Sequence, residues 1–148
     1  MRLLWLLASA VLVLAACDST PPPHPLAGTS WRLLSLESMS DEQGTTTVAD
    51  PSMFTVDFGS DGQAAFRIDC NRGSATWQAS AASSDSGSLT FGPIATTRMA
   101  CPQPSLDSEV STALGYVRGF LLKDGRLHMS LLADGGILHW EPAKPDKP

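Results

Sequence analysis

The residue with the most clearly defined chemistry is Cys17, which follows two small alanines at the end of an apolar N-terminal run. Alanines at 15 and 16 fit the pocket of a signal peptidase, and the Cys17 thiol is the nucleophile that accepts a diacylglycerol before cleavage. The apolar core, residues 3–13, is too short to span a bilayer of about 30 Å as a helix. The pattern therefore predicts a lipoprotein signal peptide at 1–16 and lipid attachment at Cys17.

Residues 17–25 are rich in proline and polar side chains and predict an extended tether. Proline lacks a backbone N–H, so this stretch cannot continue a helix. His24 is expected to be solvated there. We expect the exported chain to be held by its lipid at the periplasmic side of the cell envelope. Asp18 resembles the inner-membrane retention signal of enteric bacteria, but that rule varies between lineages, so the choice of membrane stays open.

The other two cysteines, Cys70 and Cys101, form an even pair once Cys17 carries lipid. In an exported protein such a pair favours a disulfide. The bridge would close a loop of about 30 residues and add about 3–4 kcal/mol to the free energy of unfolding. Two buried free thiols are the alternative. A metal site is disfavoured because no second pair lies at ligand spacing.

A third group of residues whose side chains could do chemistry lies near the C-terminus. If Leu132 pairs with Ile137, one face of a terminal hairpin carries His128, Ser130, His139 and Glu141. Imidazole and carboxylate groups suit Zn²⁺, which would allow a metal-dependent hydrolase. A wet sheet face with polar side chains explains the same alternation without a metal. We therefore assign no metal ligand and no cofactor.

No catalytic motif supports an enzyme. The sequence has no Gly-x-Ser-x-Gly elbow, no phosphate-binding glycine loop, no dinucleotide fingerprint and no His-Glu-x-x-His. Asn71, Arg72 and Arg98 flank the cysteine pair and could form a recognition patch. Asn after a strand commonly serves a turn, so we favour structural hydrogen bonds for them. We expect no catalytic residue.

Short apolar runs separated by glycine turns predict the antiparallel strands that position these residues. The predicted strands are Trp31–Leu36, Phe54–Phe58, a run from Phe66 to Cys70, Arg72–Ser80, Ser88–Pro93, Gly119–Lys123, Arg126–Leu132 and Gly136–Glu141. Asp-Gly pairs at 61, 124 and 134 favour tight hairpins. Residues 37–52 are too polar for the core, and residues 79–87 are expected to form a mobile loop.

One segment has helical periodicity. Five apolar residues recur at helical spacing between Ser105, which can cap the start, and Gly119, which can end the helix after Arg118. The predicted fold is mainly β with one helix: a small antiparallel β-barrel or curved meander sheet covered by a single α-helix. About 120 residues support one domain, at 26–142, with a flexible tail at 143–148.

Four motifs occur in order before the helix and the terminal hairpin: Leu26–Trp31, Asp69–Gly73, Gly87–Pro93 and Thr96–Pro102. Together they resemble the META domain family, to which the heat-shock lipoprotein HslJ belongs. Asp69 departs from the glycine that the family usually has before its Cys-Asn pair. The resemblance implies a small barrel or curved sheet with one helix, and it supports pairing Cys70 with Cys101. It also implies an envelope role in stress or antibiotic tolerance without catalysis.

The charge of the chain excludes nucleic acid as a partner. Cleavage removes one of ten Lys and Arg residues and none of the 15 Asp and Glu residues, which leaves a net charge of −6. Binding to phosphates normally requires clustered basic residues. We expect a monomeric, lipid-anchored binding or structural module with an unidentified envelope protein as its possible partner. The alternatives are a barrel that holds a small apolar ligand inside and, less favoured, the hydrolase.

Overall fold

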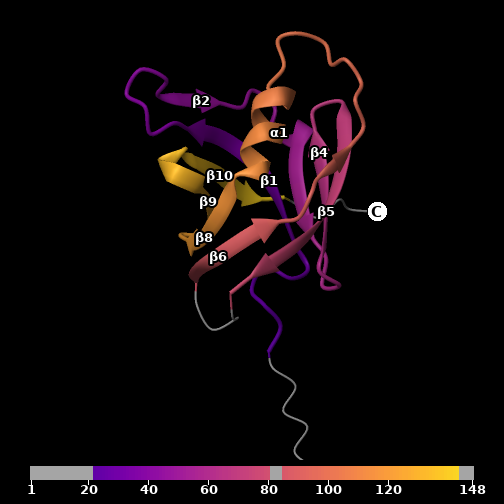
Figure 1. The fold of residues 1–148 in the computed structure, drawn as a ribbon, viewed down its shortest axis with the longest axis vertical. Helices are drawn as coiled ribbons and strands as arrows, with labels where there is room; N and C mark the ends of the chain where they lie inside the picture. The colour runs from indigo at the N-terminus through magenta and orange to yellow at the C-terminus, as the bar shows by residue number, and fades with distance from the viewer. Residues whose placement is uncertain (1–21, 81–84, 144–148) are drawn as a thin grey trace, which may run out of the picture.

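Eight antiparallel strands close into a barrel because the first and the last of them pair with each other (Figure 1). The computed structural model describes residues 22–80 and 85–143, so the signal peptide and Cys17 lie outside the described residues. The ring contains β1 (Thr29–Glu37), β3 (Phe54–Phe58), β4 (Gln63–Ile68), β5 (Asn71–Ala79), β6 (Ser86–Phe91), β8 (Val117–Lys123), β9 (Arg126–Leu131) and β10 (Ile137–Pro142). The fold class predicted from the sequence is confirmed.

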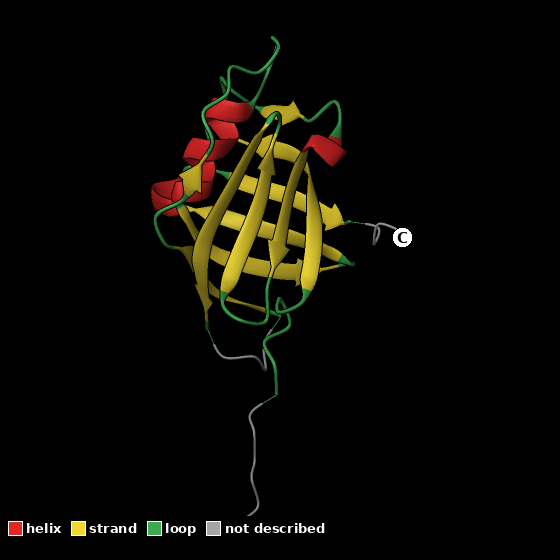
Figure 2. Cartoon of the chain, turned by 90° about the vertical axis from the view of Figure 1, so that its right-hand side faces the viewer, coloured by secondary structure: helices red, strands yellow, loops and turns green. Residues whose placement is uncertain are grey.

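In the part of the chain that the structure describes, five smaller elements lie outside the ring. Strand β2 (Thr45–Thr47) pairs with β1, and β7 (Ala95–Thr96) pairs with β5. The helix α1 spans Asp107–Gly115, and two short 3₁₀ helices, η1 and η2, span Pro51–Met53 and Leu132–Asp134. Figure 2 shows the strands nearest the viewer running almost vertically and those behind running across them.

Side chains fill the barrel interior. Each strand points alternate residues inward, and every strand of the ring contributes at least one buried apolar side chain. Several large side chains are almost fully buried there, among them Trp140, Phe58, Leu33, Ile68 and Leu89. An apolar ligand held inside the barrel would have to displace this core, so the structure disfavours that alternative.

The two ends of the barrel are covered differently. Val110, Ala113 and Leu114 of α1 join the core at the upper end in Figure 1, while the N-terminal segment leaves from the lower end. There the His24 ring packs edge-on against Trp77 and Phe120, with centroid distances of 5.7 and 5.3 Å. The prediction that His24 is solvated was therefore wrong.

The helix is shorter than predicted at both ends. It begins at Asp107 and ends at Gly115, because the Tyr116 N–H donates back to Ala113 O and Val117 already pairs with Leu131 of β9. Val117 is fully buried as a strand residue rather than as part of a helical stripe. Gly119 therefore lies within β8 and does not end the helix.

Two other segments differ from prediction. Residues 37–52 were predicted to be outside the core, yet Val48 is buried and β2 pairs with β1. The predicted loop at 79–87 is partly strand, because Ser86 and Gly87 belong to β6. Residues 81–84 of that loop lie outside the described residues. In residues 22–80 and 85–143, no helix is long and apolar enough to cross a membrane.

Candidate functional site

A disulfide joins the turn after β4 to the segment that leads into α1. The Cys70 and Cys101 sulfurs are bonded at 2.03 Å, and their Cα atoms are 5.5 Å apart. Cys70 lies in the turn between β4 and β5 rather than on the inward face of a strand, because β4 ends at Ile68 and Asp69 has a φ of +56°. The bridge therefore fixes the end of the barrel that α1 covers.

Asn71 holds the backbone beside this disulfide. Its side chain is only 6 % exposed, and its Nδ2 donates to Met99 O at 3.1 Å. Its Oδ1 accepts from Thr97 Oγ1 at 2.9 Å and from Met99 N at 2.8 Å. Buried amide groups need such partners, so Asn71 is a structural residue, in agreement with the favoured interpretation. The side chains of Arg72 and Arg98 are exposed.

Asp69 links the same turn to the start of α1. Its Oδ2 accepts from Ser105 Oγ at 2.5 Å, and Ser105 Oγ in turn accepts from Asp107 N at 3.2 Å. Ser105 therefore satisfies an N–H group of the first helical turn, although Leu106 occupies the position next to the helix. A glycine at this position, which is usual in the family that the sequence resembles, could not make the contact with Ser105.

A polar groove of about 450 Å³ lies between α1 and the chain segment 96–100. Five hydroxyl-bearing residues line it, and Arg98 and Asp107 add one charge of each sign. The hydroxyl-bearing residues are Thr96, Thr97, Ser108, Ser111 and Thr112. Because Asn71 and the disulfide hold one wall, this groove is a rigid surface that offers many hydrogen-bond donors and acceptors.

An apolar groove of about 570 Å³ lies on the other side of α1. Tyr116 and Leu132 in its lining are 51 % and 48 % exposed, which is unusual for such large apolar groups. A second hollow of about 260 Å³ adjoins it and shares Glu109, Ala113 and Leu131 with it. The polar groove and the apolar groove therefore flank α1 at the end of the barrel opposite the N-terminal segment.

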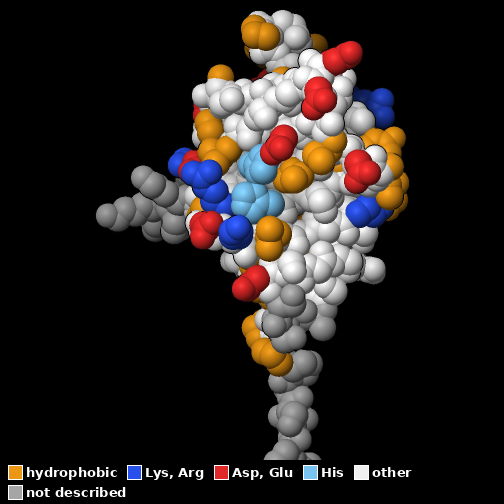
Figure 3. Space-filling view, turned by 90° about the vertical axis from the view of Figure 1, so that its left-hand side faces the viewer, with side chains coloured by type: hydrophobic (Ala, Val, Ile, Leu, Met, Phe, Trp, Pro, Cys, Tyr) orange, Lys and Arg blue, Asp and Glu red, His pale blue; other side chains and the backbone are white. Residues whose placement is uncertain are grey.

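The two C-terminal histidines meet on the outer face of the barrel. His139 of β10 pairs directly with His128 of β9, and their Nδ1 atoms are 2.7 Å apart. His139 Nε2 lies 2.7 Å from Oε2 of Glu37, at the end of β1. Figure 3 shows the two rings side by side at the surface with an acidic side chain next to them. Burial is the main cause of the lowered pKa of His128, and the neighbouring His139 lowers it further.

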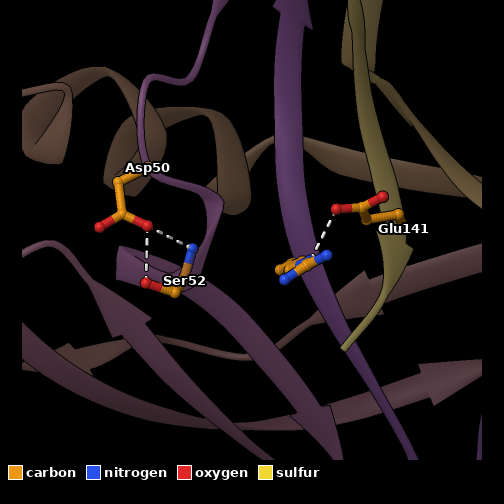
Figure 4. A network of polar contacts seen from close by, with 4 residues as sticks. Asp50, Ser52 and Glu141 are labelled. Atoms are coloured by element: carbon orange, nitrogen blue, oxygen red, sulfur yellow. Dashed lines mark hydrogen bonds and ion pairs between the residues drawn. The ribbon is translucent and has the colours of Figure 1, made fainter. Parts of the chain in front are cut away.

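The sequence analysis expected Glu141 beside the histidines, but the carboxylate that contacts them is Glu37. Ile137 pairs with Ser130 instead of Leu132, so the register differs by two residues while the polar and apolar faces stay as predicted. Glu141 forms an ion pair with Arg32 of β1 at 2.6 Å (Figure 4). Within the described part of the chain, no group of three or more His, Cys, Asp and Glu side chains is placed to hold a metal.

Sequence reasoning missed Glu37 because it lies 102 positions from His139. The contact exists only because β1 pairs with β10, and the sequence carries no local signal for that pairing. The partners of Asn71 were missed for a similar reason. Thr97 and Met99 lie 26 and 28 positions away, in a segment without a periodic pattern.

Solved structures support the fold. An NMR structure of a protein from Burkholderia xenovorans is similar with a TM-score of 0.63 at 20 % identity, covering 91 % of this chain and 99 % of that one. A crystal structure of a DUF4847 family protein from Bacteroides vulgatus is similar with a TM-score of 0.55 at 14 % identity, covering 82 % and 97 %. No curated protein matches the chain.

The match to a family model covers most of the molecule. It spans residues 24–144, which include the whole barrel, the disulfide and both grooves. The matched region begins at His24, whose ring packs against the barrel end. With the motifs, the closed barrel and the helix α1 in agreement, the chain belongs to the META domain family.

Proposed function

We propose that the mature protein is a lipid-anchored, non-catalytic binding module at the periplasmic side of the cell envelope, acting in stress or antibiotic tolerance. The signal pattern with Cys17 supports the anchor, and the resemblance to the META domain family supports the envelope role. The partner is an envelope protein or another molecule of the envelope, and the binding surface is the α1 end of the barrel.

The observation that carries this proposal is the position of the grooves relative to the anchored end. The segment that follows Cys17 reaches the barrel at His24, which packs against Trp77 and Phe120 at the lower end. Both grooves flank α1 at the upper end. A lipid on Cys17 would therefore hold the lower end toward the membrane and leave the grooves facing away from it.

Site-specific photo-crosslinking in cells tests the binding surface. A photoreactive amino acid replaces Thr112, which lies between the two grooves, in the full-length anchored protein. The matched control carries it at Asp124, an exposed residue of the hairpin at the other end. We expect discrete products from position 112 that change under envelope stress. Equal products from both positions, or none from position 112, would contradict the proposed surface.

The anchor is tested by replacing its cysteine. Cys17→Ala removes the thiol that accepts lipid, so the protein should leave the membrane fraction and lose its labelling by radioactive palmitate. Cys70→Ala paired with Cys101→Ala keeps Cys17 and serves as the control, which should remain in the membrane fraction. Membrane retention of the Cys17→Ala protein would show that something other than a lipid holds it.

Binding of a small apolar ligand is the second candidate function. Because core side chains fill the barrel interior, the groove beside Tyr116 and Leu132 is the surface that could take such a ligand. A lipid or hydrophobic drug bound there would raise the melting temperature by mass action. Leu132→Asp should abolish that rise, whereas Leu121→Asp, at an exposed leucine of β8, should preserve it.

A further inference from the structure

Three side chains on the outer face of β1, β10 and β9 form a continuous hydrogen-bonded row. Glu37 Oε2 lies 2.7 Å from His139 Nε2, and His139 Nδ1 lies 2.7 Å from His128 Nδ1. We call Glu37, His139 and His128 the histidine row. At this distance the two facing Nδ1 atoms share one proton, because a hydrogen bond needs a donor on one side and a lone pair on the other.

The Glu37 carboxylate fixes the protons of the row when both rings are neutral. A carboxylate only accepts hydrogen bonds, so the contact requires a proton on His139 Nε2. A neutral ring carries one proton, so His139 Nδ1 holds a lone pair that accepts the proton on His128 Nδ1. His128 Nε2 is then the unprotonated ring nitrogen at the end of the row, and the first added proton binds there.

The first added proton keeps both contacts. It binds at His128 Nε2 while the proton on His128 Nδ1 passes to His139 Nδ1, so His128 stays neutral in the opposite tautomer. His139 becomes the cation and donates from both nitrogens. The Glu37 carboxylate, 2.7 Å away, favours the positive charge on His139, whereas burial disfavours it on His128.

The charges around His128 disfavour a second added proton. Besides burial, which is the largest cause, His139, Arg126 of the same strand and Lys123 of β8 lower the pKa of His128 below its ordinary value of 6.5. Asp124 in the turn after β8 opposes them but is the smallest of these effects. The second proton is therefore taken up at a lower pH than the first.

The other elements packed around the row add little charge to it. Leu121 of β8 pairs with the histidine of β9, and β2, which pairs with the end of β1, consists of three threonines. Glu141 of β10 forms an ion pair with Arg32 of β1. Glu109 of α1 lines the hollow at the carboxylate end of the row.

We propose that the histidine row is a two-step pH switch on the outside of the barrel. The second proton binds at His128 Nδ1 and gives each facing nitrogen a hydrogen, so the contact between the rings breaks. As pH falls, the net charge of the row changes from one negative charge to none and then to one positive charge. Because Glu37 lines the hollow beside the apolar groove, the switch changes the charge next to that hollow.

Nuclear magnetic resonance of the full-length protein in detergent tests the proposal. Long-range proton–nitrogen spectra of protein with labelled histidines report the tautomer and charge of each ring, and they are recorded from about pH 8 to about pH 4.5. We expect His128 to change from the Nδ1–H to the Nε2–H tautomer at the pH where His139 becomes charged. His128 should become charged only at lower pH, with loss of the signal of the shared proton.

Variants separate the switch from independent titration. In His139→Gln, His128 should titrate in one step without an earlier change of tautomer. Glu37→Gln should move the first step to lower pH, whereas the matched control Glu141→Gln should preserve the tautomer change. Circular dichroism melts verify that each variant is folded. A wild type in which His128 keeps one tautomer until it becomes charged, or in which both rings become charged together, would overturn the proposal.

Discussion

Asn71 is the buried polar residue on which the wall of the polar groove depends. Replacing it with alanine leaves the Met99 carbonyl and N–H groups without their partner, so Asn71→Ala should lower the free energy of unfolding by about 2–4 kcal/mol. Urea denaturation measures the change. The neighbouring exposed residue gives the control, and Arg72→Ala should stay within about 0.5 kcal/mol of the wild type.

Asp69 occupies a backbone conformation that glycine adopts more easily. The φ of Asp69 is +56°. Asp69→Gly relieves the strain of this conformation but loses the contact with Ser105, so the two effects on the free energy of unfolding should nearly cancel. Asp69→Ala loses the contact and keeps the strain, and should cost about 1–2 kcal/mol more than the glycine variant. Thermal melts rank the three proteins. Equal stability of the alanine and glycine variants would show that strain at this position is negligible.

The carboxylate of Asp50 makes the stability of the barrel depend on pH in the acidic range. Its carboxylate accepts from Ser52 Oγ at 2.6 Å and from Ser52 N at 3.0 Å (Figure 4), and the hydroxyl bond is the main cause of its lowered pKa. A lowered pKa in the folded state contributes stability above the unfolded value of 3.8 and loses it as pH falls through the folded value. The stability difference between wild type and Asp50→Asn should therefore shrink on acidification from pH 5 to pH 2.5. Urea midpoints at both values measure it.

At the scale of elements, the disulfide ties the β4–β5 turn to the segment before α1. Its partners are 31 positions apart, and removing that constraint from the unfolded chain should cost about 3–4 kcal/mol. Cys70→Ser with Cys101→Ser should lower the free energy of unfolding by this amount, and Cys17 is left unchanged in this variant. Adding reductant to the wild type should reproduce the loss. A double variant as stable as the wild type would mean that packing alone holds this end.

Most strands could be predicted because their signals are local. Alternation at Phe54, Val56 and Phe58 places one face inside, and Asp124 and Gly125, with φ of +53° and +72°, form the two-residue turn expected between β8 and β9. The end of α1 could not be predicted in this way. The spacing of Val117 fits a helix, but its pairing with Leu131 outweighs that weak local preference.

The candidate site was harder to predict than the strands. The sequence placed His128 and His139 on one face correctly, since a register error of two residues preserves the face. It could not supply Glu37, whose position follows from closure of the whole ring. The grooves beside α1 likewise depend on how the helix lies across the barrel end, and no spacing in the sequence encodes that position.

At the scale of the whole molecule, the two ends of the domain lie side by side. Trp31 pairs with Pro142, and Ala143 N donates to Ser30 O at 2.9 Å. A short glycine linker from residue 143 to residue 26, with new ends opened between Asp124 and Gly125, should therefore give a circular permutant that folds. Circular dichroism and a single cooperative melt would verify it. A permutant that fails to fold would mean that the β8–β9 turn is required for the barrel to form.

The pairing of β1 with β10 also has a consequence for incomplete chains. The ring is completed by β10, the last of its strands in the chain, and a stop just after β9 leaves two open edges, on β1 and on β9. Such edges expose rows of unpaired N–H and C=O groups that recruit strands from other molecules. A chain that ends before Ile137 should therefore aggregate rather than persist as a smaller domain. Loss of the last strand would thus turn a closed barrel into a template for self-association.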